Sequence, residues 1–151
     1  MKMTARVGTM TALLIATATA PALAQQRGTP DPERAASRQV LLELGTYLQD
    51  GKWGQADSLF ATRGVHVLAD TSAFHSWADY REKSLKPDLA KYSGLKVAHT
   101  GVESQVRGNV AWVAFKQEVG GSSGTPRIGR GSAVLEKLDG RWTIVHYHIS
   151  R

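Results

Sequence analysis

The stretch Asp139-Gly-Arg-Trp-Thr-Ile-Val-His-Tyr-His-Ile-Ser150 combines a hairpin turn with a strand whose two faces differ in character. Side chains alternate between the two faces of a strand. The pattern therefore predicts one face with two histidines at its polar end and an apolar opposite face. The first face holds Trp142, Ile144, His146 and His148, and the second holds Val145, Tyr147 and Ile149. An aromatic end followed by a titratable end suggests one wall of a pocket.

The Asp139-Gly140 pair is the strongest turn signal, because a type I′ turn needs positive φ at both central residues. A regular hairpin around it pairs Leu138 with Arg141, Glu136 with Thr143, Val134 with Val145 and Ser132 with Tyr147. The same register places the small residues Gly131 and Ala133 beside the two histidines. We expect these small residues to leave room above the histidines, as the floor of a cavity requires.

In the rest of the chain, apolar periodicity and turn residues predict helices before strands. Helices are expected at about residues 32–50, 53–60 and 77–85, a short strand at 65–68, and a four-strand meander at about 95–106, 110–119, 127–138 and 141–150. Ser76 and Asp79 have the spacing of a capping box, and Pro87 is expected to end or kink the third helix. The predicted fold class is α+β, a curved antiparallel sheet wrapped on N-terminal helices.

The N-terminal residues have the pattern of a secretory signal. Lys2 and Arg6 precede a moderately apolar run that ends in Ala22-Leu-Ala24, which predicts a signal peptide over residues 1–24 cut before Gln25. The apolar run is too short for a membrane anchor. Residues 25–31 are expected to form a flexible mature N-terminus and residues 32–151 a single domain, in a periplasmic or secreted protein.

Composition excludes several classes of function. The chain of 151 residues has no cysteine, which excludes disulfides, thiol catalysis and a lipid-anchoring cysteine. Its basic residues are dispersed, and export argues against a nucleic-acid partner. No glycine-rich phosphate loop or nucleophile motif is present, so no cofactor is expected.

The order of elements, with Ala111-Trp-Val-Ala-Phe115, Gly129-Arg-Gly-Ser-Ala-Val-Leu135 and the Asp139–Ser150 tail, resembles the SnoaL-like branch of the nuclear transport factor 2-like superfamily. The tail is similar to that of the calcium/calmodulin-dependent kinase II association domain. The resemblance implies a cone-shaped α+β fold of the cystatin-like type, a pocket between helices and sheet, and homodimers packed through the sheet. It covers about residues 33–150 and leaves the activity open, because the superfamily includes isomerases, dehydratases, cyclases, binding proteins and oligomerisation modules.

The resemblance also bears on single positions. Phe74-His75 resembles the pocket histidine of the association domain, and Arg130 resembles an arginine of exported bacterial relatives. Other arginines of the association domain are replaced in this chain, which argues against carrying over its acidic ligand. The replacing residues are Gln117, Ala133 and Ile149.

We expect a site that binds a small, partly apolar molecule, lined by His75, Trp112, Arg130, His146 and His148. One alternative is an isomerase, dehydratase or cyclase that uses a pocket histidine with a carboxylate, although no acid–base pair stands out. Another is a pure oligomerisation module. A zinc site on His146 and His148, completed by His75, His99 or a carboxylate, is not expected, because no further ligand motif supports it.

Overall fold

The computed structural model describes residues 31–90, 96–120 and 125–150. The expected signal peptide, nearly all of the mature N-terminal segment and part of the 120–126 connection lie outside these residues. The helical elements are α1 (Pro32–Gln49), α2 (Trp53–Ser58), α3 (Trp77–Tyr80), the π-helix η1 (Arg81–Leu85) and α4 (Lys86–Ala90). The strands are β1 (His66–Ala69), β2 (Ser72–Phe74), β3 (Lys96–Arg107), β4 (Val110–Gly120), β5 (Arg127–Leu138) and β6 (Arg141–Ser150).

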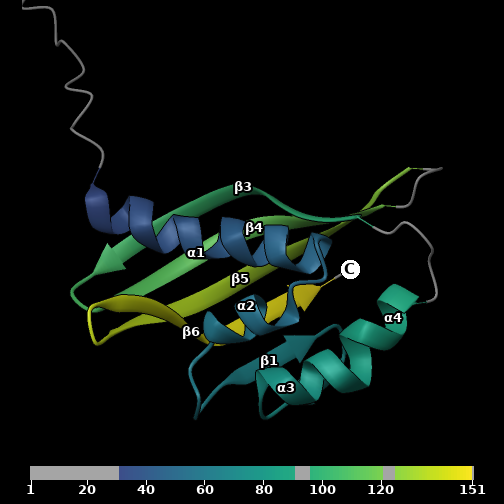
Figure 1. Cartoon of the computed structure of the whole chain (residues 1–151). Helices are drawn as coiled ribbons and strands as arrows, with labels where there is room; N and C mark the ends of the chain where they lie inside the picture. Colours follow the sequence, from purple (N-terminus) through teal and green to yellow (C-terminus); the bar gives the residue numbers. More distant parts are fainter. Residues whose placement is uncertain (1–30, 91–95, 121–124, 151) are drawn as a thin grey trace, which may run out of the picture.

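The six strands form one mixed sheet in the order β2-β1-β6-β5-β4-β3. The predicted meander is confirmed, since β3 to β6 pair antiparallel in sequence order. The short strand β1 pairs parallel with β6, and β2, which the sequence did not predict, pairs with β1. Figure 1 shows α1 along β3 and β4, and α3 and α4 beside β1. The α+β prediction is therefore confirmed, with a mixed sheet in place of a purely antiparallel one.

The predicted capping box and central turn are present, and α1 has a cap of its own. Asp31 caps α1 by accepting a hydrogen bond from the backbone N–H of Glu33, with Pro32 in the first turn. Ser76 accepts from the backbone N–H of Asp79 in the expected capping geometry. In the β5–β6 turn, Asp139 and Gly140 have φ values of 49° and 79°. Local sequence chemistry thus fixes where these elements begin and end.

The third helical region continues further than expected. Helical backbone runs from Trp77 to Ala90, with a π-helical turn at Arg81–Leu85 and Pro87 in the second position of α4. Proline lacks an N–H and crowds the preceding helical turn. A wider π turn just before it relieves that conflict, so Pro87 follows a change of helix type and does not end the helix.

The face assignment within β6 is wrong beyond Ile144. Leu135 pairs with Ile144 but Val134 pairs with His146, which leaves Val145 as the extra residue of a β-bulge. The expected pairs of Val134 with Val145 and Ser132 with Tyr147 are therefore replaced by pairs with His146 and His148. An extra residue reverses the alternation of side chains along a strand.

As a consequence, Tyr147 and Ile149 point into the core, with exposed fractions of 1% and 0%. His146 and His148 are half-buried on the sheet face away from α1, which we call the outer face. The expected apolar stripe that included Tyr147 and Ile149 therefore does not lie on the outer face. The prediction that both histidines line a cavity under the helices is also wrong.

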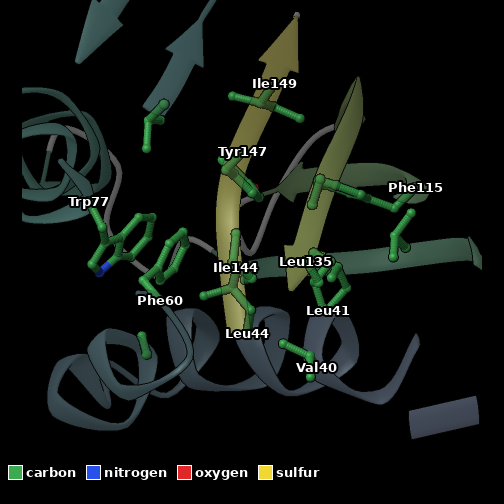
Figure 2. Packing of buried hydrophobic residues seen from close by; sticks show 14 of the residues in the cluster. Val40, Leu41, Leu44, Phe60, Trp77, Phe115, Leu135, Ile144, Tyr147 and Ile149 are labelled. Atoms are coloured by element: carbon green, nitrogen blue, oxygen red, sulfur yellow. The ribbon is translucent and has the colours of Figure 1, made fainter. Parts of the chain in front are cut away.

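The core lies between α1 and the inner face of the sheet and extends toward α3. Figure 2 shows Leu41 and Leu44 of α1 beneath Leu135 and Ile144. On the other side of β6, the rings of Phe60 and Trp77 stack with centroids 4.1 Å apart. Apolar and aromatic side chains thus pack between β6 and α3.

Candidate functional site

Three polar side chains meet inside this apolar core, and we call them the interior polar network. They are His99 of β3, Gln117 of β4 and Tyr147 of β6, with exposed fractions of 6%, 2% and 1%. His99 and Gln117 are cross-strand partners on neighbouring strands. Tyr147 reaches them from β6, across the intervening strand β5.

Small residues on β5 make this meeting possible. Ala133 is the cross-strand partner of Tyr147, and Gly131 is the partner of Phe115. A Cβ atom added at Gly131 would lie only 2.3 Å from the Phe115 ring. The ring therefore fills the space that the sequence suggested would stay open above Gly131. Glycine and alanine on the inner face of β5 allow side chains of its two neighbours to meet over it.

The hydrogen bonds of the network form a chain of donors from Gln117 through Tyr147 and His99 to the Leu41 carbonyl. The Leu41 carbonyl lies 2.8 Å from Nδ1 of His99, and because a carbonyl only accepts, Nδ1 carries the proton. Nε2 of His99 is then an acceptor, 3.2 Å from the Tyr147 hydroxyl, which donates to it. The amide nitrogen of Gln117 in turn donates to the Tyr147 oxygen at 3.1 Å.

Burial keeps His99 uncharged at neutral pH. Desolvation lowers the pKa of His99 from 6.5 to about 4, and the hydrogen bond to the Leu41 carbonyl opposes this effect only partly. Helix α1 approaches β3 closely here, since a Cβ at Gly45 would lie 2.9 Å from the backbone nitrogen of His99. The interior polar network is therefore neutral and held between α1 and the sheet.

Aromatic rings surround the network on two sides. The Phe115 ring lies 4.5 Å from the His99 ring and 5.6 Å from the Tyr147 ring, between centroids. On the side of α3, Phe60 and Trp77 approach Tyr147 edge-on at 6.2 and 6.3 Å. Figure 2 shows Phe60 beside Trp77, with Tyr147 on the neighbouring strand β6. The site combines uncharged hydrogen-bonding groups with aromatic walls.

The five residues predicted to bind a ligand lie elsewhere. Trp112, Arg130, His146 and His148 are on the outer face, and His75 is exposed beyond β2. Trp112 and His146 both pair with Val134, so they occupy one row across the sheet. Their ligand-binding role remains a prediction, but the structure moves it from the interior to the outer face.

His66, which the sequence interpretation did not consider, lies beside His146 and His148 on the outer face. His66 of β1 is the cross-strand partner of His146, and the His75 ring lies 6.1 Å from the His66 ring. Burial, then the nearby His148 and His66, lower the pKa of His146. We call His66, His146 and His148 the outer histidine cluster. In the described part of the chain, no group of three or more histidine, cysteine or acidic residues is arranged to hold a metal ion.

A surface groove of about 340 Å³ lies between α1, α2 and the β5–β6 turn. Its charged lining residues are Glu43 and Arg141, and Val40, Leu59 and Trp142 supply its apolar part. None of the predicted ligand residues and none of the interior polar network lines this groove. Across the described ranges, no helix is long and apolar enough to cross a membrane.

The sequence patterns do not predict the interior polar network. They offer His99 only as an additional zinc ligand and Gln117 only as a replaced arginine, and unbroken alternation along the last strand puts Tyr147 on the wrong face. One signal was available in the sequence. Gly129-x-Gly131-x-Ala133 leaves one face of β5 almost without side chains, which indicates that large side chains of neighbouring strands meet there.

The model of the SnoaL-like domain family matches residues 38–151, and the chain therefore belongs to this family. No curated protein matches the chain significantly. Solved structures share the fold at low sequence identity. A nuclear transport factor 2-like protein of unknown function from Pseudomonas putida has a TM-score of 0.70 at 13% identity, covering 82% of this chain and 89% of that one.

Two further structures carry an activity in their descriptions. A proposed ketosteroid isomerase from Shewanella frigidimarina has a TM-score of 0.64 at 24% identity, covering 76% of this chain and 94% of that one. A proposed dehydratase from Streptomyces avermitilis has a TM-score of 0.66 at 17% identity, covering 81% and 97%. At these identities the likeness establishes the fold alone.

Proposed function

We propose that the chain binds a small, partly apolar molecule between the helices and the sheet, with the interior polar network as its polar contact. The observation that carries this proposal is the meeting of His99, Gln117 and Tyr147 in a core that is otherwise apolar. Buried polar groups cost stability unless they are hydrogen-bonded, and apolar residues would pack there at lower cost. A ligand-recognition role explains why three such groups converge.

The chemistry of the network defines the class of ligand. All three side chains are uncharged at neutral pH, and the tyrosine hydroxyl both donates and accepts. The surrounding rings of Phe60, Trp77 and Phe115 favour an apolar body. The expected ligand is therefore an uncharged molecule with a hydroxyl or carbonyl group at one end. A carboxylate would meet no cation in the network.

Binding is favoured over acid–base catalysis by the same geometry. A histidine with a pKa of about 4 is a weak base at neutral pH. Its partners among the described residues are a backbone carbonyl, a tyrosine and a glutamine, with no carboxylate to orient it as a catalytic pair would require. The isomerase or dehydratase alternative, which two relatives suggest by their descriptions, has less support.

Native mass spectrometry of the protein purified from its own host tests this proposal. The wild type should retain a small molecule. Tyr147→Phe keeps the ring but removes the hydroxyl, so ligand retention should fall by about tenfold, as expected when one hydrogen bond to the ligand is lost. Tyr47→Phe, on α1 and outside the network, is the matched control and should retain the ligand. A wild type without bound molecule, or equal retention in Tyr147→Phe, would contradict the proposal.

A second proposal is that two copies pair through the outer face, and the exposed apolar residues there favour it. Five large hydrophobic side chains of this face are at least 38% exposed: Leu68, Val110, Trp112, Ile128 and Leu138. Val110 and Trp112 are neighbours on this face of β4, beside Val134 of β5, and adjoining exposed apolar side chains favour an interface. The face also carries the basic pair Lys116 and Arg130, and the acidic Glu103 and Glu136. A twofold axis that passes between the basic pair and Glu136 would bring opposite charges of the two copies together.

Light scattering tests the pairing. Trp112→Glu places a charge in the middle of the apolar face and should yield monomers, while Gln55→Glu adds the same charge on α2 and should leave dimers intact. A monomeric wild type, or a dimeric Trp112→Glu variant, would rule this interface out.

Location is the third part of the proposal. Residues 1–24 direct export and are removed before Gln25, which places the protein in the periplasm or the medium. N-terminal sequencing of the protein recovered from those fractions should read from Gln25. Recovery of the chain there with Met1 still present would contradict cleavage.

A further inference from the structure

We propose that protonation of the outer histidine cluster separates two copies that pair through the outer face. This inference rests on the proposed pairing and adds a control to it. The chain has five histidines, and four of them gather at this part of the surface: His66, His75, His146 and His148. Only His99 lies in the core.

The cluster lies within the apolar part of the face. His146 stands in the same row as Val134 and Trp112, and His148 is the cross-strand partner of the exposed Leu68. Neutral imidazoles can be buried beside such residues at modest cost. Charged imidazoliums cannot, because desolvation of an unpaired charge is expensive.

Among the described residues, no ion pair or hydrogen bond joins a carboxylate to these three imidazoles. The other titratable and charged groups on or beside this face are Asp70 directly after β1, His75 near β2, Lys96, Glu103 and Arg107 on β3, Lys116 and Glu118 on β4, Arg130 and Glu136 on β5, and Arg141 on β6. Glu118 already accepts from Thr100, and Glu103 lies three strands away from β6.

The direction of the effect follows from linkage. Burial and the neighbouring histidines lower the pKa of His146 in one copy, and covering the face with a second copy adds burial. The separated copies then bind protons more readily than the pair, so pairing weakens as pH falls. A closed interface would cover six imidazoles, three from each copy, and protonation would place charges among its apolar residues. Since an ordinary imidazole titrates near pH 6.5, separation should occur between about pH 7 and pH 5.

Sedimentation analysis of the full mature chain from about pH 8 to pH 5 tests the inference, with circular dichroism to follow folding. The dissociation constant of the wild-type dimer should rise about 100-fold over this range, as expected when two or more protons are linked to separation. A triple variant with glutamine at positions 66, 146 and 148 keeps polar side chains that do not titrate. Its dissociation constant should change by less than about threefold.

A second variant does not depend on acid. His146→Lys carries a permanent charge and should be a folded monomer even at about pH 8. A wild-type dimer that is independent of pH, acid dissociation retained in the triple variant, or a His146→Lys variant that pairs normally would each overturn the inference and leave the pairing intact. A wild type that is monomeric at pH 8 would overturn the pairing and the inference together.

Discussion

At the scale of single residues, His99 shows how burial changes the chemistry of a side chain. The imidazole is covered by α1 and Phe115, and its proton is fixed on Nδ1 by the Leu41 carbonyl. Above pH 6.5 the histidine is neutral in the folded and the unfolded state alike. Below it, the unfolded chain gains a proton that the folded protein does not accept until about pH 4.

Acidification should therefore remove stability through His99. Between about pH 7.5 and pH 4.5 the loss from this group should be about 3 kcal/mol. His99→Asn keeps an N–H that can bond to Leu41 but does not titrate. Urea unfolding at both pH values should show a smaller pH dependence for this variant than for the wild type. His75→Asn, which replaces an exposed histidine, is the control and should behave as the wild type.

Gly131 is a second position where one atom decides the packing. A Cβ atom built at Gly131 would lie only 2.3 Å from the Phe115 ring. Gly131→Ala must displace that ring and should cost roughly 1–3 kcal/mol, as overpacking does. Gly54→Ala in α2 meets nothing within 4 Å and should be neutral or slightly stabilising. Equal urea midpoints for the two variants would show that Phe115 moves without cost.

At the scale of elements, the bulge in β6 decides what the fold presents on each side. The hairpin turn, the strand lengths and the pairing from Leu138 to Leu135 follow from the sequence. The bulge does not, because Thr-Ile-Val-His-Tyr-His reads equally well as an unbroken alternation. The backbone N–H of Ile144 donates to the Leu59 carbonyl, and the Ile144 carbonyl accepts from the N–H of Ala61. These residues are distant from Ile144 in the sequence. The bulge follows from this tertiary contact and from burial of Tyr147, which local patterns do not encode.

Deleting Val145 tests this account. Without the extra residue, His146 still pairs with Val134 and Tyr147 with Ala133, so every other side chain keeps its face. The variant should fold with a modest loss of stability. Deleting Thr143 instead brings Ile144 to the outer face and Val145 into the core, at a cost of several kcal/mol for a misplaced core residue. Thermal melts should separate the two deletions. A Thr143 deletion as stable as the Val145 deletion would contradict the assigned bulge.

At the scale of the whole molecule, the sequence predicted the layers but not all of their contacts. Helices followed by a meander define an α+β sheet with a helix on one face, and α1 with β3 to β6 confirms it. The parallel pairing of β1 with β6 joins residues 80 positions apart in the sequence. Periodicity describes one segment at a time and gives no information about such a pairing. The candidate site was misplaced for the same reason, since its location depends on contacts between distant strands.

One indole joins the region of α3 and α4 to the rest of the molecule. Trp77 stacks on Phe60, and its Nε1 donates to Asp57 at 2.8 Å. The same carboxylate pairs with Arg81 in the following π-helix. Trp77 itself is 4% exposed and also approaches Tyr147 and Tyr80. This stacked ring and this shared carboxylate thus attach residues 77–90 to α2 and β6, together with the buried Tyr80, whose ring lies 6.4 Å from that of Tyr147.

Replacing Trp77 should therefore loosen one part of the molecule before the rest. Trp77→Ala removes the stacking and the hydrogen bond and should cost roughly 3–5 kcal/mol, as truncation of a core aromatic does. Trp77→Phe keeps the stacking and should cost about 1–3 kcal/mol for the lost bond to a carboxylate. In hydrogen exchange of the alanine variant, amides of residues 77–90 should lose protection while those of α1, β3 and β4 keep most of theirs. If α1 and β3 lost protection to the same extent, the molecule would unfold as a single unit, and the indole would stabilise the whole fold rather than one attachment.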